Sequence, residues 1–100
     1  RGGKIVVGPK DGEATPVIPL TFTLQGVHEI SAVGTIFPDS HGQPRVHMHA
    51  ALGREGKARV GCIRTGIEVW KIGEIIVLEI IDNTAQRKED SKTGFTMLES

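Results

Sequence analysis

This chain of 100 residues has a single cysteine, no formal net charge and no long apolar run. Its single cysteine excludes an intrachain disulfide and favours a reducing compartment, so we expect a cytoplasmic protein. The longest apolar run, residues 75–78, is too short to cross a bilayer, and no stretch resembles a signal peptide. Lys and Arg total 12 and Asp and Glu total 12, so the composition shows no basic excess for contacting nucleic-acid phosphates.

Helical periodicity is missing as well. No window keeps an apolar period of 3.6 residues, whereas several short segments alternate or are rich in β-branched residues. The pattern predicts strands at residues 4–7, 28–37, 45–52, 57–63, 67–72 and 74–81, and a final edge strand near 95–98. Residues 74–81 are typical of a strand buried on both faces. We therefore expect one domain, residues 1–100, that is mostly β with a predominantly antiparallel sheet.

A predicted hairpin brings two histidines and the cysteine together. His47 and His49 are two residues apart on a strand, so both side chains point to the same face. A turn then leads into the strand that carries Cys62. If Glu55-Gly56 form a two-residue turn, His49 lies directly opposite Cys62. A three-residue loop would place His49 opposite Gly61 instead.

One metal ion could bridge these three side chains, because imidazole and thiolate are preferred zinc ligands and directly opposed residues are close enough. His47, His49 and Cys62 are therefore a candidate zinc site. The fourth ligand is left open among water, His28, His41 and a neighbouring subunit. The alternative is that the histidines face solvent or a subunit interface while Cys62 is an ordinary buried side chain.

Four further positions have a functional and a structural interpretation. Arg64 and Lys71 could line a pocket near the histidines and bind an anion, or they could belong to solvated faces. Glu74 could act as a general base or support a metal-bound histidine, or it could be an edge carboxylate. Trp70 is a lone aromatic that offers no platform for base stacking, so we expect it to pack in the core or an interface.

The combined pattern resembles the PPC (plant and prokaryote conserved) domain family. The resemblance is carried by residues 26–35, by the strand His47-Met48-His49 and by residues 60–63, and it covers most of residues 4–98. Members include the plant AT-hook nuclear-localised proteins and small bacterial and archaeal proteins described as predicted DNA-binding proteins. The resemblance implies an α+β domain with a mostly antiparallel sheet, a homotrimer, and in some members zinc at the histidine cluster.

The chain departs from that family pattern in two places. Val60-Gly61-Cys62-Ile63 stands where a Gly-Gly-His-Leu stretch is usual, so cysteine replaces a third histidine and the ligand set changes without being lost. The family domain usually has a strand–helix–strand unit upstream of the position of Arg1. We therefore expect that the helix-bearing N-terminal part is absent from this chain, which leaves one sheet face without its covering helix.

Three functions are open on this basis. The first, which the resemblance implies, is a regulatory oligomerisation module, a homotrimer that acts with DNA or with a transcription partner. The plant relatives hold DNA through a separate AT-hook, and this chain has no Arg-Gly-Arg core of that kind. The second is a purely structural trimerisation domain. The third is a small zinc-dependent enzyme with water as the fourth ligand, which we rank last because the sequence places no general base.

Overall fold

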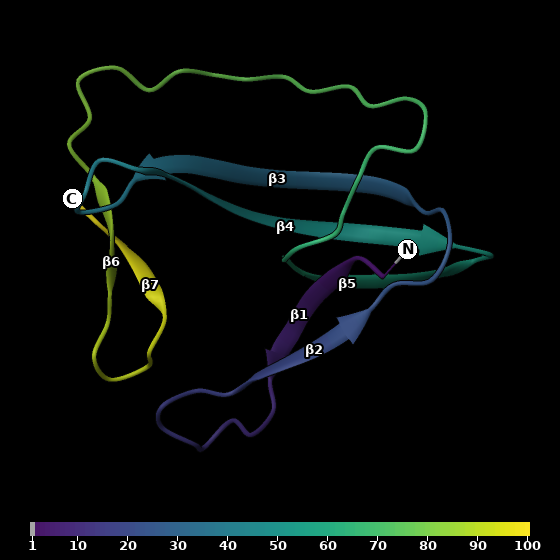
Figure 1. The fold of residues 1–100 in the computed structure, drawn as a ribbon, viewed down its shortest axis with the longest axis horizontal. Helices are drawn as coiled ribbons and strands as arrows, with labels where there is room; N and C mark the ends of the chain where they lie inside the picture. The colour runs from purple at the N-terminus through teal and green to yellow at the C-terminus, as the bar shows by residue number, and fades with distance from the viewer. Residues whose placement is uncertain (1) are drawn as a thin grey trace.

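The computed structural model describes residues 2–100, and its regular structure consists of two antiparallel sheets (Figure 1). The larger sheet has the strand order β2-β1-β5-β4-β3, and the smaller one pairs β6 with β7. The strands are β1 (Lys4–Pro9), β2 (Pro19–Thr23), β3 (Glu29–Pro38), β4 (Pro44–Arg54), β5 (Lys57–Ile63), β6 (Gln86–Glu89) and β7 (Thr96–Glu99). Residues 2–100 contain no helix, so the mostly β prediction is confirmed. That range accordingly offers no helix long and apolar enough to cross a membrane.

β4 and β5 form the predicted hairpin. Glu55 and Gly56 both have positive φ, 55° and 77°, which is the backbone of a two-residue turn that matches the twist of the flanking strands. Arg54 pairs with Lys57 directly across this turn, and the ladder continues to the pair His49–Cys62. The two-residue register is therefore confirmed and the three-residue loop is excluded.

The five-stranded sheet has two different faces because side chains alternate along each strand. One face carries the core, formed by Ile5, Leu24, Ala50 and Leu52, with Phe22, Ile63 and Ile67 packed against it. The opposite face carries His47, His49 and Cys62. A slip of one residue in β4 would exchange the faces, so the packing of Ala50 and Leu52 also fixes the direction of the histidines.

β3 forms as predicted, but it is a more exposed strand than its pattern indicates. It is the edge of the sheet, and its apolar residues Ile30 and Ile36 are 52% and 65% exposed. Gly34 lies in a regular register opposite Met48, so no bulge is present. A Cβ on Gly34 would lie 2.7 Å from the backbone oxygen of His47, which means that β3 and β4 approach each other here more closely than a side chain permits.

The structure of residues 64–85 differs from the sequence-based prediction of two strands in this range. No residue in this range lies in a strand, and Figure 1 shows the segment as a long arch that runs outside the β3 edge before it reaches β6. The strands predicted at 67–72 and 74–81 are therefore wrong. Ile76 is 91% exposed and its neighbour Val77 is 78% exposed, so neither face of the second segment is buried. A β-branched composition favours an extended backbone, but a strand also needs a partner, and no strand among residues 2–100 pairs with it.

The predicted final strand forms in a different sheet. β7 pairs with β6 along its whole length, and β6 is a strand that the sequence analysis did not predict. A single bridge between Asp39 and Arg87 ties this hairpin to the loop between β3 and β4. The hairpin therefore places Arg87 next to the five-stranded sheet.

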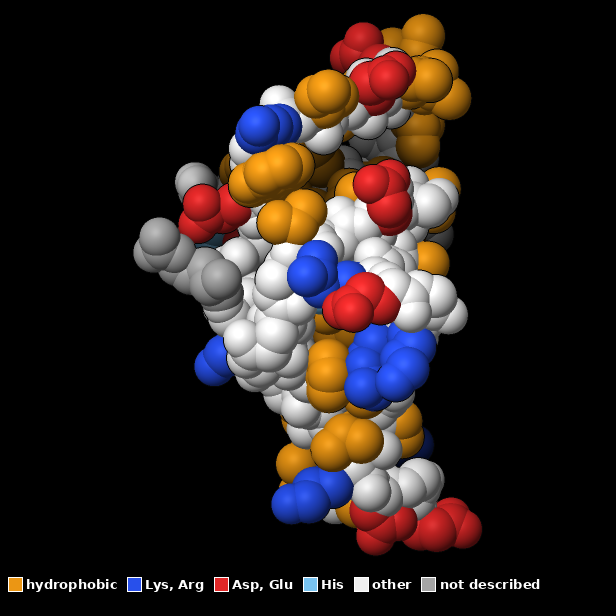
Figure 2. Space-filling model, turned by 90° about the vertical axis from the view of Figure 1, so that its right-hand side faces the viewer, with side chains coloured by type: hydrophobic (Ala, Val, Ile, Leu, Met, Phe, Trp, Pro, Cys, Tyr) orange, Lys and Arg blue, Asp and Glu red, His pale blue; other side chains and the backbone are white. Residues whose placement is uncertain are grey.

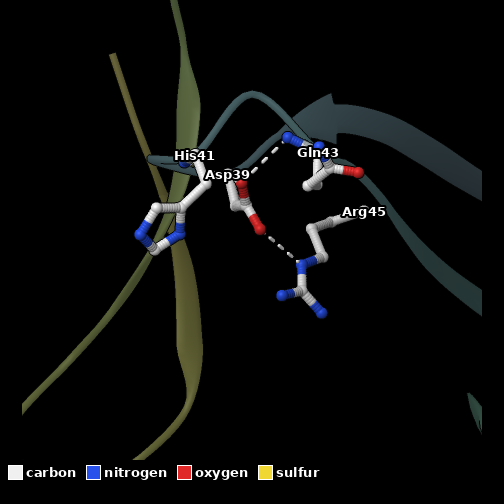
Figure 3. Close-up of polar contacts among 4 residues, drawn as sticks. All are labelled: Asp39, His41, Gln43 and Arg45. Carbon is white, nitrogen blue, oxygen red and sulfur yellow. Dashed lines mark hydrogen bonds and ion pairs between the residues drawn. The ribbon is translucent and has the colours of Figure 1, made fainter.

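Asp39 organises the loop between β3 and β4 (Figure 3). Its Oδ1 atom accepts hydrogen bonds from the backbone N–H groups of His41 at 2.8 Å and Gln43 at 3.0 Å, and its Oδ2 atom accepts one from Nε of Arg45 at 2.9 Å. The backbone hydrogen bond from Gln43, followed by those from His41 and Arg45, holds the pKa of Asp39 below its usual value. The hydrogen bonds of this loop therefore stabilise the ionised form of the Asp39 carboxylate.

The substitution Asp39→Asn is expected to destabilise the domain in a pH-dependent way. A carboxyl group with a lowered folded pKa stabilises the fold above its unfolded value of about 4, and this contribution is lost as the pH falls through the folded pKa. In urea titrations, we expect the variant to be less stable than the parent at pH 7 and the difference to shrink below about pH 4. Asp11→Asn, which alters one exposed turn hydrogen bond, is the control. A difference that does not change with pH would contradict the role of the charge.

Candidate metal centre

The structure brings together the three side chains that the sequence singles out. His47 and His49 project from β4 and Cys62 from β5, on the sheet face opposite the core, and their ligand atoms all lie within 4.8 Å of one another. The Nε2 atoms of the two histidines are 3.2 Å apart. Cys62 is buried while both histidines are exposed, so the group opens toward solvent through its imidazoles.

The spacing of the two histidine nitrogens fits a tetrahedral zinc ion. Zinc–nitrogen bonds of about 2.0–2.1 Å at a tetrahedral angle place two ligand nitrogens about 3.3 Å apart, close to the observed 3.2 Å. The rings are tilted by 59° with centroids 4.9 Å apart, so they are not stacked on each other. A metal ion would use a lone pair from both nitrogens, whereas a direct hydrogen bond uses the lone pair of only one.

The surroundings of His47 favour its metal-binding form. Desolvation is the largest cause that lowers the pKa of His47, and the nearby charges of Arg87, His49 and Arg64 lower it further. Neutral imidazole is the form that coordinates a metal. These surroundings therefore favour the neutral form of His47, which can bind a metal, near neutral pH.

The sequence was compared with models of known protein families. The chain matches the Plants and Prokaryotes Conserved (PCC) domain over residues 3–81. The chain belongs to the PCC domain family. This confirms the resemblance drawn from the sequence, and the matched range contains all three candidate ligands. Comparisons with curated proteins and with solved structures gave no match.

Two guanidinium groups stand beside the three ligands of this PCC domain. Nη1 of Arg64 donates to Sγ of Cys62 at 2.7 Å and to the backbone oxygen of Ile63 at 3.1 Å. Nη2 of Arg87 donates to Oγ1 of Thr35 at 3.0 Å, and Thr35 is the cross-strand neighbour of His47. Sequence reasoning identified Arg64 but missed Arg87, because no local pattern shows that the C-terminal hairpin reaches back to β3.

The other histidines do not complete the metal site. Nδ1 of His28 lies 3.0 Å from the backbone oxygen of Gly26, and His41 belongs to the loop around Asp39. Neither joins the group of converging ligand atoms. Within residues 2–100 the candidate ligand set therefore has three members, and a metal bound by them would need a fourth ligand from another group.

Trp70 and Lys71 lie apart from the core and interact with each other. The Lys71 ammonium is 4.7 Å from the centroid of the Trp70 ring, a cation–π contact. Trp70 is 68% exposed, so it is not part of the core, and of the two expected roles only packing at an interface stays a prediction. Of the two cations considered for anion binding, Arg64 is the one in contact with a candidate ligand.

Proposed function

We propose that this PCC domain is a zinc-binding regulatory oligomerisation module, with zinc held by His47, His49 and Cys62. The observation that supports zinc most directly is the convergence of two imidazole nitrogens and a thiol sulfur within 4.8 Å. Nitrogen and sulfur donors suit zinc, whereas magnesium and calcium prefer oxygen ligands. Metal analysis of the purified protein tests this directly: about one zinc per chain supports the proposal, and a chain that takes up no added zinc contradicts it.

Oligomerisation is supported by the apolar surface of residues 69–81. Nine apolar side chains of this segment are at least three-fifths exposed: Val69, Trp70, Ile72, Ile75, Ile76, Val77, Leu78, Ile80 and Ile81. Figure 2 shows hydrophobic side chains gathered at the top of the molecule, where Figure 1 places the arch. Soluble monomers rarely expose a continuous apolar surface of this kind, so further copies of the chain are the proposed cover, in a homotrimer.

The double substitution Ile76→Lys with Leu78→Lys is expected to convert the trimer to a monomer. Two charges in the apolar segment would have to be buried without partners in an assembly that covers it. Light scattering coupled to gel filtration measures the mass directly. The matched control is Gln25→Lys with Ser91→Lys, which adds the same charges at exposed sites outside the segment. A trimer that survives the first pair of substitutions would show that this segment is not the interface.

The proposed regulatory role operates through a protein partner rather than through direct contact with DNA. The chain has no net charge, and on the face drawn in Figure 2 acidic and basic side chains lie beside one another. Strong binding to DNA depends on neutralising phosphates with an excess of Lys and Arg. An enzymatic role gains no support from the site, because no Asp or Glu among residues 2–100 joins the converging ligands as a general base.

A further inference from the structure

The charges around the three ligands are unbalanced. A zinc ion with one thiolate and two neutral imidazoles carries a net positive charge, and Arg64 and Arg87 add two more. The ion pairs within residues 2–100 are Arg45–Asp39, Arg54–Glu55 and Lys88–Glu99. Neither Arg64 nor Arg87 belongs to one of them. The site therefore has a surplus of positive charge that an anion would neutralise.

Both arginines also keep hydrogen-bonding capacity that the described part of the protein does not use. Nε of Arg87 is buried and has no hydrogen-bond partner among residues 2–100. Arg64 makes both of its hydrogen bonds through Nη1 alone, so its other two nitrogens are unoccupied in this range. Buried donors are nearly always paired in folded proteins, so the unpaired Arg87 Nε adds to the positive charge that is left uncompensated beside His47.

A shallow apolar groove adjoins the same histidine cluster. It has a volume of about 260 Å³, and its lining includes the side chains of His49, Val33, Ala51 and Val60. These side chains occupy the sheet face of His49, because Val33 pairs with His49 and Ala51 pairs with Val60. The three candidate ligands therefore lie between the arginines and a short apolar surface.

We propose that the metal centre binds the carboxylate of a small organic acid, with Arg64 and Arg87 balancing its charge and the groove beside His49 receiving its apolar chain. The inference rests on the proposed zinc centre, whose open position takes a carboxylate oxygen. A guanidinium presents a planar fork of donors that matches a carboxylate. Inorganic phosphate would also satisfy the charge, but it would leave the apolar groove unfilled.

The test uses the cobalt-substituted protein, because the visible spectrum of bound Co²⁺ reports both metal uptake and a change of its ligands. Butyrate is expected to alter the spectrum saturably, while its neutral amide, butyramide, leaves the spectrum unchanged. Acetate is expected to bind more weakly than butyrate, by about twofold to fourfold for each methylene removed from the groove. Binding of phosphate with no binding of butyrate would overturn the assignment to a carboxylate.

Substitution of the arginines tests whether their positive charge is needed for carboxylate binding and not for metal binding. Arg64→Gln and Arg87→Gln are each expected to weaken butyrate binding about tenfold to a hundredfold while the protein still binds about one cobalt per chain at saturating Co²⁺. Arg59→Gln is the matched control, because Arg59 belongs to the same sheet but its guanidinium lies over the Phe22 ring on the opposite face. Unchanged butyrate binding in both site variants would overturn the role of the arginines.

The metal proposal and the ligand proposal fail in different ways. A protein that takes up cobalt but shows no response to any carboxylate retains the metal centre and overturns the ligand inference. A protein that takes up no cobalt overturns the metal centre itself. Loss of cobalt in the arginine variants would show that Arg64 and Arg87 hold the ligand set in place, which contradicts their assignment to the anion.

Discussion

Replacing any one of His47, His49 and Cys62 with alanine is expected to weaken zinc binding by about a hundredfold or more. A structural zinc site contributes about 10–16 kcal/mol in total, so the share of one ligand is about 3 kcal/mol, and about 1.4 kcal/mol corresponds to a factor of ten. The three variants should behave alike, because the three ligand atoms converge on one point. Competition with a chromophoric chelator measures the affinity of each variant.

His28→Ala and His41→Ala are the matched controls for this series. Both histidines are outside the converging group, so their loss should leave the zinc affinity within about twofold of the parent. An equal loss of affinity in a control variant would mean that the histidines bind metal nonspecifically. Retention of full affinity without Cys62 would show that the thiol is a packed side chain and not a ligand.

Gly61→Ala is expected to destabilise the domain by about 3 kcal/mol, the largest stability effect that we predict for a single methyl group. A Cβ at this position would lie 2.5 Å from the backbone oxygen of Val6 and 3.1 Å from its carbonyl carbon. Val6 pairs with Cys62 in the ladder between β1 and β5, so the strands would have to separate where Ile5 enters the core. Urea titration followed by tryptophan fluorescence or circular dichroism measures the loss.

Gly53→Ala controls for the replacement of a strand glycine as such. A Cβ on Gly53 would meet its nearest atom, the backbone oxygen of Lys57, at an ordinary 3.6 Å. We expect a change below about 1 kcal/mol at this position. If the two variants lost the same stability, the close approach of β1 to Gly61 would not be the cause.

The hairpin that carries the candidate site could be predicted from the sequence because its information is local. Gly56 is typical of a turn position with positive φ, and a two-residue turn at Glu55-Gly56 places His49 opposite Cys62, whereas the three-residue loop that the sequence left open would not. Arg87 could not be predicted in the same way. Its place beside His47 depends on the bridge between Asp39 and Arg87, which joins residues far apart in the sequence.

The pairing and burial of segment 74–81 could not be predicted from its sequence. Its composition correctly indicates an extended backbone, because β-branched side chains disfavour other conformations. Whether such a segment becomes a strand depends on a neighbour with free hydrogen-bonding groups, and composition carries no information about that neighbour. Ile76 and Leu78 are therefore exposed although the pattern predicts burial on both faces.

The arch also determines how this chain behaves at high concentration. Residues 75–81 combine β-branched side chains with the absence of proline, which is the composition of segments that stack into steric zippers. Glu74 and Glu79 place negative charge before and within the run, where such residues oppose the stacking of identical chains. We therefore expect that neutralising these two carboxylates by acid would favour fibres that begin at this segment.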